Sequence, residues 1–331
     1  MTAQREDLVD PHGRTVRDLR ISVTDRCNFR CSYCMPAEGM EWLPRSELLT
    51  FEEIERVARV FVERFGVDGI RLTGGEPTVR AHLPLLVSKL SALDVDLSMT
   101  TNGATFRLLA EDLRAAGLDR VNVSLDSLRR DRFLAITRRD ELERVFDGIA
   151  AAKESGFDPV KVNVVLERGM NDDEIVEFAT WGREQHVAVR FIEFMPLDAS
   201  GAWARDKVVS QDEILAAISA AYPLVPAPSR GAAPADRWLY ADGKGDVGVI
   251  PSVTKPFCGD CDRVRLTAEG QLRTCLFETR EFDLRAIVRN GGSDDELAAE
   301  IVRAVGTKWA GHQIGQVTFI RPNRSMSQIG G

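Results

Sequence analysis

Residues 20–34 read RISVTDRCNFRCSYC, a strand-like run that leads directly into three closely spaced cysteines. Cys27, Cys31 and Cys34 form the pattern C-x3-C-x2-C. The chain has 6 cysteines in 331 residues, so chance would produce roughly 0.002 copies of this pattern. Three thiolates held close together need a cation to offset their repulsion. The spacing therefore predicts a metal site directly after a β-strand.

A second cysteine triplet lies near the other end of the sequence, where Cys258, Cys261 and Cys275 form C-x2-C-x13-C. Each triplet has an odd number of thiols and the cytosol keeps thiols reduced, so we do not expect disulfides. Structural zinc prefers four protein ligands, and neither triplet has an obvious fourth, although zinc is the main alternative at the second site. A 4Fe-4S cluster normally takes four cysteines. Three cysteines leave one iron open to an outside ligand, which makes the site a place for chemistry.

Composition and charge exclude several classes of protein. Hydrophobic residues make up 44% of the chain and charged residues 28%, which is enough for a large buried core. No apolar run reaches the roughly 18 residues of a membrane span, and the first residues are polar, so we expect a cytoplasmic protein without a leader or an anchor. The net charge of −8 argues against a nucleic-acid partner. An anionic ligand would need a local cationic pocket.

Strand-like runs alternate with amphipathic helical patterns from residue 19 to about residue 195. Such a series predicts an α/β fold, in which a parallel sheet with helical crossovers curls into a partial (βα)6 TIM-like barrel. One helix begins at Thr50, where Glu53 completes a capping box. Catalytic residues of such barrels lie at the carboxyl ends of the strands. We expect strands at Leu19–Val23, Gly69–Thr73, Asp96–Thr101, Arg120–Leu125, Val160–Leu166 and Val189–Met195.

The remaining sequence predicts a C-terminal α+β extension that carries the second triplet. Residues 223–234 are rich in Pro, Ala and Gly and are interpreted as a linker or an exposed loop. We therefore expect one domain at residues 1–225 and another at 226–331. Residues 243–248 read GKGDVG, which opens no helix and is interpreted as a hairpin turn. A helix is expected from about Asp294 to Trp309.

The first triplet in its setting, followed by Met35-Pro36, resembles the signature of radical S-adenosylmethionine (SAM) enzymes. Gly74-Gly75-Glu76-Pro77 after a strand resembles their second signature. The second triplet, Arg263-Val264-Arg265 and the terminal Gly330-Gly331 narrow the resemblance to the family that cyclises GTP in molybdenum cofactor biosynthesis. The resemblance spans about Arg20 to Gly331. It implies the radical SAM type of barrel, two 4Fe-4S clusters, SAM as a consumed cosubstrate and GTP as the substrate.

The resemblance also implies ligand contacts. Gly74 and Gly75 have no Cβ, which would let a ligand approach the backbone closely. A triphosphate carries about four negative charges, so cationic side chains should converge on it, and alternation in Arg263-Val264-Arg265 puts both arginines on one face of a strand. The implied SAM contacts are the main chain of Tyr33, Gly75, Ser124 and Met195; the implied GTP contacts are Arg20, Arg71, Thr100, Lys161, Arg263 and Arg265.

The implied reaction is hydrogen abstraction from C3' of the GTP ribose and bonding of that carbon to C8 of guanine, which gives 3',8-cyclo-7,8-dihydro-GTP. The open iron of the second cluster would bind the guanine base. Arg263, Arg265, Gly330 and Gly331 are the candidate catalytic residues, and the tail is implied to insert into the active site. A frayed end or an adenylation tail are the other interpretations of Gly330-Gly331.

Implied partners are an electron-donor protein and the downstream cyclic pyranopterin monophosphate synthase, for a protein that is a monomer or a homodimer. Two other functions stay open at this point. One is a radical SAM peptide-modifying maturase with an auxiliary iron–sulfur cluster. The other is a zinc-binding regulatory protein without redox chemistry.

Overall fold

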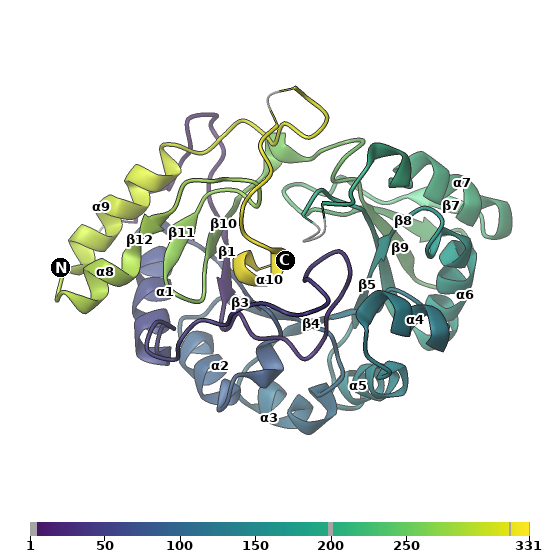
Figure 1. The fold of residues 1–331 in the computed structure, drawn as a ribbon, viewed down its shortest axis with the longest axis horizontal. Helices are drawn as coiled ribbons and strands as arrows, with labels where there is room; N and C mark the ends of the chain where they lie inside the picture. The colour runs from purple at the N-terminus through teal and green to yellow at the C-terminus, as the bar shows by residue number, and fades with distance from the viewer. Residues whose placement is uncertain (1–4, 198–200, 318, 331) are drawn as a thin grey trace.

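The computed structural model describes residues 5–197, 201–317 and 319–330. In these ranges, one curved sheet of 12 strands carries helices on its outer side and a short helix, α10 (Met326–Ile329), inside the curve (Figure 1). The strands follow one another in the order β12-β11-β10-β1-β2-β3-β4-β5-β6-β9-β8-β7. The sheet is therefore an open barrel, because β12 and β7 end its two edges without pairing to each other.

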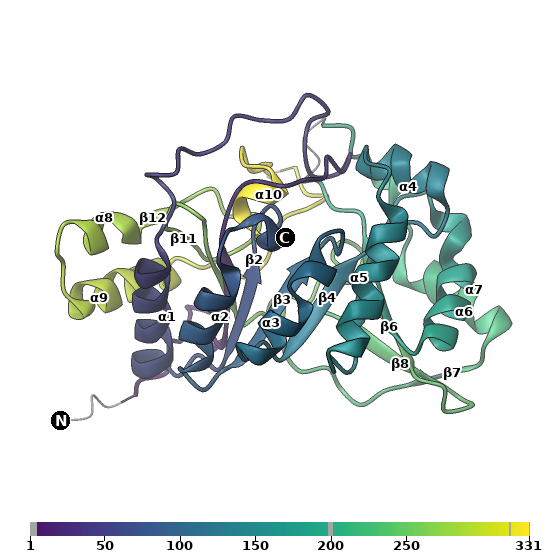
Figure 2. The same ribbon diagram turned by 90° about the horizontal axis from the view of Figure 1, so that it is seen from below.

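The central strands are mutually parallel and alternate with helices. They are β1 (Asp18–Ser22), β2 (Gly69–Thr73), β3 (Asp96–Thr101), β4 (Arg120–Ser124), β5 (Lys161–Leu166) and β6 (Ala188–Glu193). The outer helices are α1 (Phe51–Phe65), α2 (Leu83–Ser91), α3 (Ala110–Ala115), α4 (Arg130–Thr137), α5 (Leu142–Glu154), α6 (Ile175–Gln185) and α7 (Gln211–Ala221). Figure 2 shows α1, α2, α3 and α5 lying over one side of β2, β3 and β4. The predicted α/β partial barrel is confirmed, with strand ends within two residues of the expected positions.

Helix α1 begins where the capping box predicts. The Thr50 hydroxyl accepts from the main-chain N–H of Glu53 at 3.2 Å, and the Glu53 carboxylate accepts from the main-chain N–H of Thr50 at 2.7 Å. Gly66 ends the helix in the left-handed conformation, with φ 66°. None of the described helices is both long enough and apolar enough to span a bilayer.

The two faces of the central sheet have different chemistry because successive side chains of a strand point to opposite sides. In β1, Leu19 and Ile21 are fully buried in the core, whereas Arg20 lines the inner side. The same alternation in β2 sends Leu72 into the core and Arg71 to the inner side. The inner face is therefore polar and lines a cavity. In a closed βα barrel, by contrast, packed side chains fill the interior.

The C-terminal part of the chain adds three strands to each edge of the central sheet. They are β7 (Leu224–Pro226), β8 (Asp236–Tyr240) and β9 (Asp246–Ile250) at one edge, and β10 (Arg263–Leu266), β11 (Gln271–Arg273) and β12 (Phe282–Asp283) at the other. β9 pairs parallel with β6 and β10 pairs parallel with β1, while the outer strands are antiparallel. The extension is thus continuous with the barrel, and a domain division at residue 225 stays a prediction.

The structure differs from two local predictions. Leu224–Pro226, inside the predicted linker at residues 223–234, forms β7, because an edge strand tolerates a proline that cannot donate a ladder hydrogen bond. The helix expected at Asp294–Trp309 ends earlier, since α9 spans Asp294–Val305 and follows α8 (Leu284–Arg289). A hairpin turn is confirmed between β8 and β9, but only residues 243–245 of the predicted segment 243–248 lie in it, because residues 246–248 belong to β9.

Candidate active site

A cavity of about 790 Å³ lies on the inner side of the sheet. It is lined by both cysteine triplets, by the glycine motif after β2 and by side chains of the central strands. All of the predicted SAM and GTP contacts line it, namely Arg20, Tyr33, Arg71, Gly75, Thr100, Ser124, Lys161, Met195, Arg263 and Arg265. The predicted roles require that these residues line one cavity, as they do. That they bind SAM and GTP stays a prediction.

The two triplets lie at opposite ends of the cavity. The first follows the carboxyl end of β1, as predicted for a barrel of this type. Cys258 and Cys261 precede β10, which runs parallel to β1, so the second triplet lies at the amino end. A five-residue strand such as β1 is about 16 Å long. The cavity therefore separates the two triplets by about the length of a strand, with the inner face of the sheet between them.

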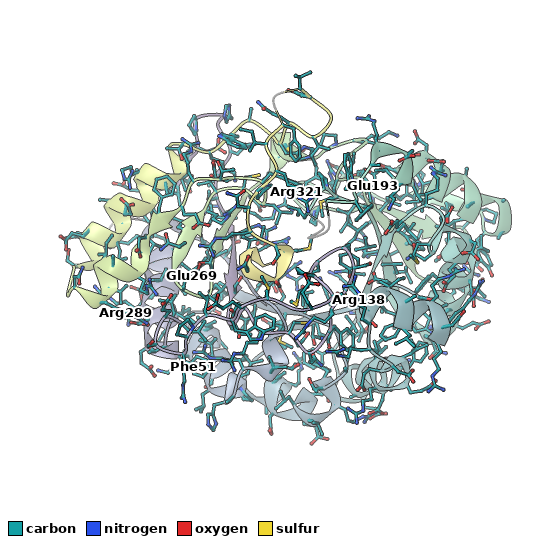
Figure 3. The ribbon with its side chains drawn as sticks, viewed as in Figure 1. Phe51, Arg138, Glu193, Glu269, Arg289 and Arg321 are labelled. Carbon is teal, nitrogen blue, oxygen red and sulfur yellow. The ribbon has the colours of Figure 1, made fainter. Side chains whose placement is uncertain are left out.

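The first triplet is held in a loop whose carbonyl groups are bound by arginines. Arg30 donates through Nη1 to the main-chain oxygen of Cys27 at 2.7 Å. Arg138, which lies beside this loop in Figure 3, donates to the carbonyls of Arg30 and Met35 at 2.9 and 3.1 Å. Burial and the charge of Glu76 raise the pKa of Cys27 to about 11. Burial and the charge of Cys27 raise the pKa of Cys34 to about 12.

Positively charged side chains lie close to the second triplet and affect the pKa values of its thiols. Burial raises the pKa of Cys275 and that of Cys258. At Cys261, burial acts in the same direction, but the positive charges of Arg263 and Lys308 outweigh it and lower the pKa. Cys261 is thus the thiol of this triplet whose ionised form its surroundings favour most.

The residues present fit iron–sulfur clusters. In each triplet, the charge of one thiolate raises the pKa of another, so the three sulfurs lie within electrostatic reach of one another. Within the described ranges, no three His, Cys, Asp or Glu side chains are arranged around a single metal ion. The sulfur atoms that hold a cubane cluster lie farther apart than the ligands of a single ion, because each thiolate binds a different iron. Bound iron would also stabilise the thiolate forms that burial disfavours.

Gly74 and Gly75 are required for a reason other than the predicted approach of a ligand. A Cβ on Gly75 would collide with the main-chain oxygen of Arg26 and lie 2.5 Å from that of Asp25. Gly74 has φ 136°, a conformation that favours glycine. The motif packs directly against the main chain that leads into the first triplet, and hydrogen bonds of 2.8 Å from Gly75 and Glu76 fix this contact.

A row of cationic side chains crosses the inner face between the two triplets. The register pairs Arg265 of β10 with Arg20 of β1, and Arg20 with Arg71 of β2. Val264 lies in the core, so the predicted alternation in Arg263-Val264-Arg265 is confirmed. Lys161 is the first residue of β5, whereas Arg20 and Arg71 are the middle residues of β1 and β2, so the cationic row extends from the middle of the sheet toward the amino ends of the strands.

The charges in this row repel one another. Burial, followed by the charges of Arg265 and Arg71, holds the pKa of Arg20 well below its ordinary value. Burial and the charge of Arg120 lower the pKa of Lys161 to about 8. Nε of Arg20 and Nη2 of Arg263 are buried without a hydrogen-bond partner in the part of the chain that the structure describes. A bound polyanion would satisfy these donors and offset the repulsion.

The C-terminal tail lies in the cavity at the carboxyl ends of β1 and β2, where the main-chain N–H and hydroxyl of Ser327 donate to Cys34 of the first triplet. Met326 and Ser327 line the cavity, and Ile329 is buried against Leu197 and Phe277. The main-chain oxygen of Gly330 accepts a hydrogen bond from Arg265. Gly331 lies outside the described residues. The predicted insertion of the tail thus agrees with the placement of Gly330, whereas a catalytic role stays a prediction.

Sequence reasoning missed several polar residues of this cavity. Asp126 follows β4 and accepts from the Tyr33 hydroxyl at 2.7 Å, and burial raises its pKa to about 6. Arg190 lines the cavity from β6 and pairs with Asp246 at 2.6 Å. Glu193, labelled in Figure 3, is fully buried next to the cavity without lining it, and it accepts from the main-chain N–H groups of residues 253 and 254 at 2.8 and 2.7 Å. The position of Asp126 and Glu193 at strand ends was the available signal, but single polar residues there are too common to select, and Arg190 lies inside β6.

Two family models match the chain: the radical SAM superfamily over residues 21–182 and Molybdenum Cofactor Synthesis C over residues 187–314. A GTP 3',8-cyclase of Streptomyces coelicolor is 50% identical over 328 residues, which is 98% of this chain and 96% of the relative. The chain belongs to the GTP 3',8-cyclase family. Another member, from Mycolicibacterium smegmatis, is 48% identical over 331 residues, which is 98% of this chain and 92% of the relative.

Solved structures agree on the fold. Methylornithine synthase (PylB) has a TM-score of 0.52 at 18% identity, over 87% of this chain and 86% of that one. Streptococcus suis SuiB bound to S-adenosylmethionine has a TM-score of 0.57 at 13% identity, over 84% of this chain and 67% of that one. Membership of a radical SAM family makes the chain an enzyme with 4Fe-4S chemistry and SAM. The peptide maturase and the zinc-binding regulator are therefore set aside.

Proposed function

We propose that this enzyme converts GTP to 3',8-cyclo-7,8-dihydro-GTP, an early step of molybdenum cofactor biosynthesis, with SAM as a consumed cosubstrate. The observation that carries the proposal is the arrangement of the cavity, where a row of buried and half-buried cations lies between two cysteine triplets. A row of this kind suits a triphosphate. The relatives' names supply the reaction.

Cys27, Cys31 and Cys34 would hold the first cluster, and Cys258, Cys261 and Cys275 the second. Bound there, the first cluster would supply an electron for reductive cleavage of SAM, and the second would supply a binding site for the guanine base. In the substrate, C3' loses a hydrogen atom and bonds to C8, and the product forms after uptake of one electron and one proton.

The chain's own side chains have three tasks in this reaction. The cationic row holds the triphosphate, which fixes the position of the ribose along the cavity. The residues at the carboxyl end, Gly75 and Ser124 among them, hold SAM. Helix α10 contacts Cys34 through Ser327 and packs Ile329 on Leu197 and Phe277, so it covers the cavity beside the first triplet and limits the entry of water.

The proposal includes two protein partners. An electron donor must deliver electrons to the first cluster, and a cyclic pyranopterin monophosphate synthase would consume the product. The cysteines of both triplets are partly exposed toward the cavity that they line.

The direct test is an anaerobic assay with reconstituted enzyme, SAM, dithionite and GTP. About eight irons per chain are expected for two clusters. Formation of 5'-deoxyadenosine should depend on GTP, and a cyclised nucleotide should form in equal amount. If the amount of 5'-deoxyadenosine does not depend on GTP and no cyclised nucleotide forms, GTP is not the substrate.

Lys161 should give the GTP reaction a characteristic pH dependence. The pKa of its ammonium is lowered to about 8, so the cation that binds the triphosphate is present below this pH and lost above it. We expect kcat/KM for GTP to fall about tenfold between pH 7 and 9, because this parameter reports on groups of the free enzyme. Lys161→Arg keeps its charge and should remove the decline; a decline unchanged in this variant would assign it to another group.

Gly330→Ala should stop most turnover while both clusters still assemble. Gly330 has φ 73°, and a Cβ there would collide with Oγ1 of Thr73 and lie 2.7 Å from Oγ of Ser22. The alanine would therefore force the tail away from Arg265. We expect a loss of cyclised product of at least about tenfold, with normal iron content.

Gly243→Ala is the matched control for this variant. Gly243 has φ 77°, nearly the same backbone conformation, but a Cβ there meets nothing within 4 Å. The control carries the same backbone strain in a hairpin turn outside the cavity, so its turnover should stay near that of the unaltered enzyme. Equal activity of the two variants would mean that the fit of Gly330 against Thr73 is unimportant.

A further inference from the structure

The loop of the second triplet is held from behind by a lysine. Nζ of Lys308 donates to the main-chain oxygens of Cys261 and Arg263, at 2.9 Å each. Only 3% of Lys308 is exposed, and the residue does not line the described cavity. The ammonium therefore touches the backbone that presents a cluster ligand, without reaching the space where substrate would bind.

Arg14 makes an equivalent contact from the other end of the sequence. Its Nη1 donates to the main-chain oxygens of Cys258 at 2.5 Å and Ala310 at 2.8 Å. Its Nη2 donates to the oxygen of Trp309 at 2.5 Å, and its Nε pairs with Asp10 at 2.6 Å. Arg14 thus ties the cysteine loop to the segment Lys308–His312, which follows helix α9.

The segment Lys308–His312 also lies in direct contact with the ligand Cys258. A Cβ on Gly311 would lie 2.9 Å from Cβ and 3.3 Å from Sγ of Cys258, so the backbone of the segment packs against the thiol. The main-chain N–H of His312 donates to Cys258, and Nε2 of His312 lies 2.8 Å from the oxygen of Ser252. The position of this segment therefore sets the position of the sulfur.

The charge of Lys308 also acts on the thiols. Asp10 acts on Lys308 as well, but its carboxylate is already paired with Arg14. The positive charge of Lys308 stabilises the thiolate of Cys261, and that of Arg14 stabilises the thiolate of Cys258. A buried charge acts strongly on its neighbours because little water screens it. One-electron reduction of a cluster held by these thiolates would add one more negative charge next to Lys308.

We propose that Lys308, supported by Arg14, is a positioning residue of the second cluster, which fixes the loop of Cys258 and Cys261 and favours the reduced form of the cluster through its positive charge. The proposal rests on the assignment of a cluster to this triplet. It concerns the potential and the retention of that cluster, and so it can fail while the cyclisation of GTP stands.

The test compares Lys308→Met and Lys308→Arg in the full-length, reconstituted enzyme. Dithionite supplies the electron, and redox titration is followed by electron paramagnetic resonance. The signal that changes when SAM is added belongs to the first cluster, and the other signal belongs to the second. Lys153→Met is the matched control, because Nζ of Lys153 also donates to a main-chain oxygen, that of Gln185 at 2.8 Å, on the outer surface.

For Lys308→Met, we expect the equilibrium constant for reduction of the second cluster to fall about tenfold, a shift of about −59 mV for one electron. The first cluster of Lys308→Met should keep its potential. Both clusters of Lys308→Arg and of Lys153→Met should also keep theirs. Selective loss of the second cluster in Lys308→Met, with retention in Lys308→Arg, would also support the proposal.

Three results would overturn it. One is an unchanged second potential with full iron in Lys308→Met. Another is equal loss of both clusters in the two Lys308 variants, which would make Lys308 an ordinary fold-stabilising residue. A third is an unaltered enzyme that binds one cluster only; this result removes the second cluster itself, and the GTP-dependent assay then decides separately on the proposed function.

Discussion

Replacement of Cys34 by alanine is expected to abolish SAM cleavage and, with it, all cyclised product. Cys34 is one of the three thiols of the first triplet, and the main-chain N–H and hydroxyl of Ser327 both donate to it. Loss of a group around a metal ligand typically costs about 10–100-fold in affinity or activity, so loss of the ligand itself should cost more. The measurement is 5'-deoxyadenosine formed with dithionite, together with iron per chain.

Ser32→Ala is a suitable control from the same loop. Ser32 is anchored through its main-chain N–H to the oxygen of Ile136 at 2.9 Å, and its side chain does not line the described cavity. This variant should keep SAM cleavage within about twofold, since the backbone anchor is retained. SAM cleavage that survives in Cys34→Ala would remove the first triplet from the electron path.

Cys275→Ala is expected to block cyclisation but to spare part of the SAM cleavage. Cys275 follows β11 and lies near Arg265, whose charge acts on its thiol. The second triplet lies about one strand length, roughly 16 Å, from the first, so its loss should leave the first cluster assembled. The expected result is about half the iron, 5'-deoxyadenosine without cyclised product, and weaker dependence on GTP.

Cys275→Ala and Cys34→Ala make the same chemical change at the two ends of one cavity. Their comparison therefore tests whether the two triplets have separate tasks. Separate tasks predict loss of both products in one variant and loss of only the cyclised product in the other. If both variants lose SAM cleavage to the same extent, the two triplets do not have separate tasks.

Much of the site could be predicted from the sequence because its signals are local. The spacing of Cys27, Cys31 and Cys34 is contained in eight consecutive residues, and the alternation in Arg263-Val264-Arg265 in three. Strand periodicity then places Arg20 and Arg71 on one face without knowledge of the rest of the chain. The same locality explains the errors: the composition of residues 223–234 conceals β7, whose pairing partner β8 decides its conformation.

The role of the glycine motif could be predicted only in part. The sequence predicts that Gly74 and Gly75 permit a close approach, but it does not show what approaches. The structure places the main chain of Asp25 and Arg26 there, so the motif fixes the entry to the first triplet. A ligand contact of Gly75 is an additional prediction, which this packing neither requires nor opposes.

The α/β class, the two triplets and the cations could be predicted without coordinates, because each depends on residues that are neighbours along the chain. Only folding brings the two triplets to opposite ends of one cavity, places Gly330 against Arg265 across 65 residues of sequence, and lets Arg14 and Lys308 hold the second loop. Arg14 lies 244 residues from Cys258 and reaches it only after β10 has paired with β1. Contacts of this kind follow from sheet register and loop closure, and no local pattern in the sequence records them.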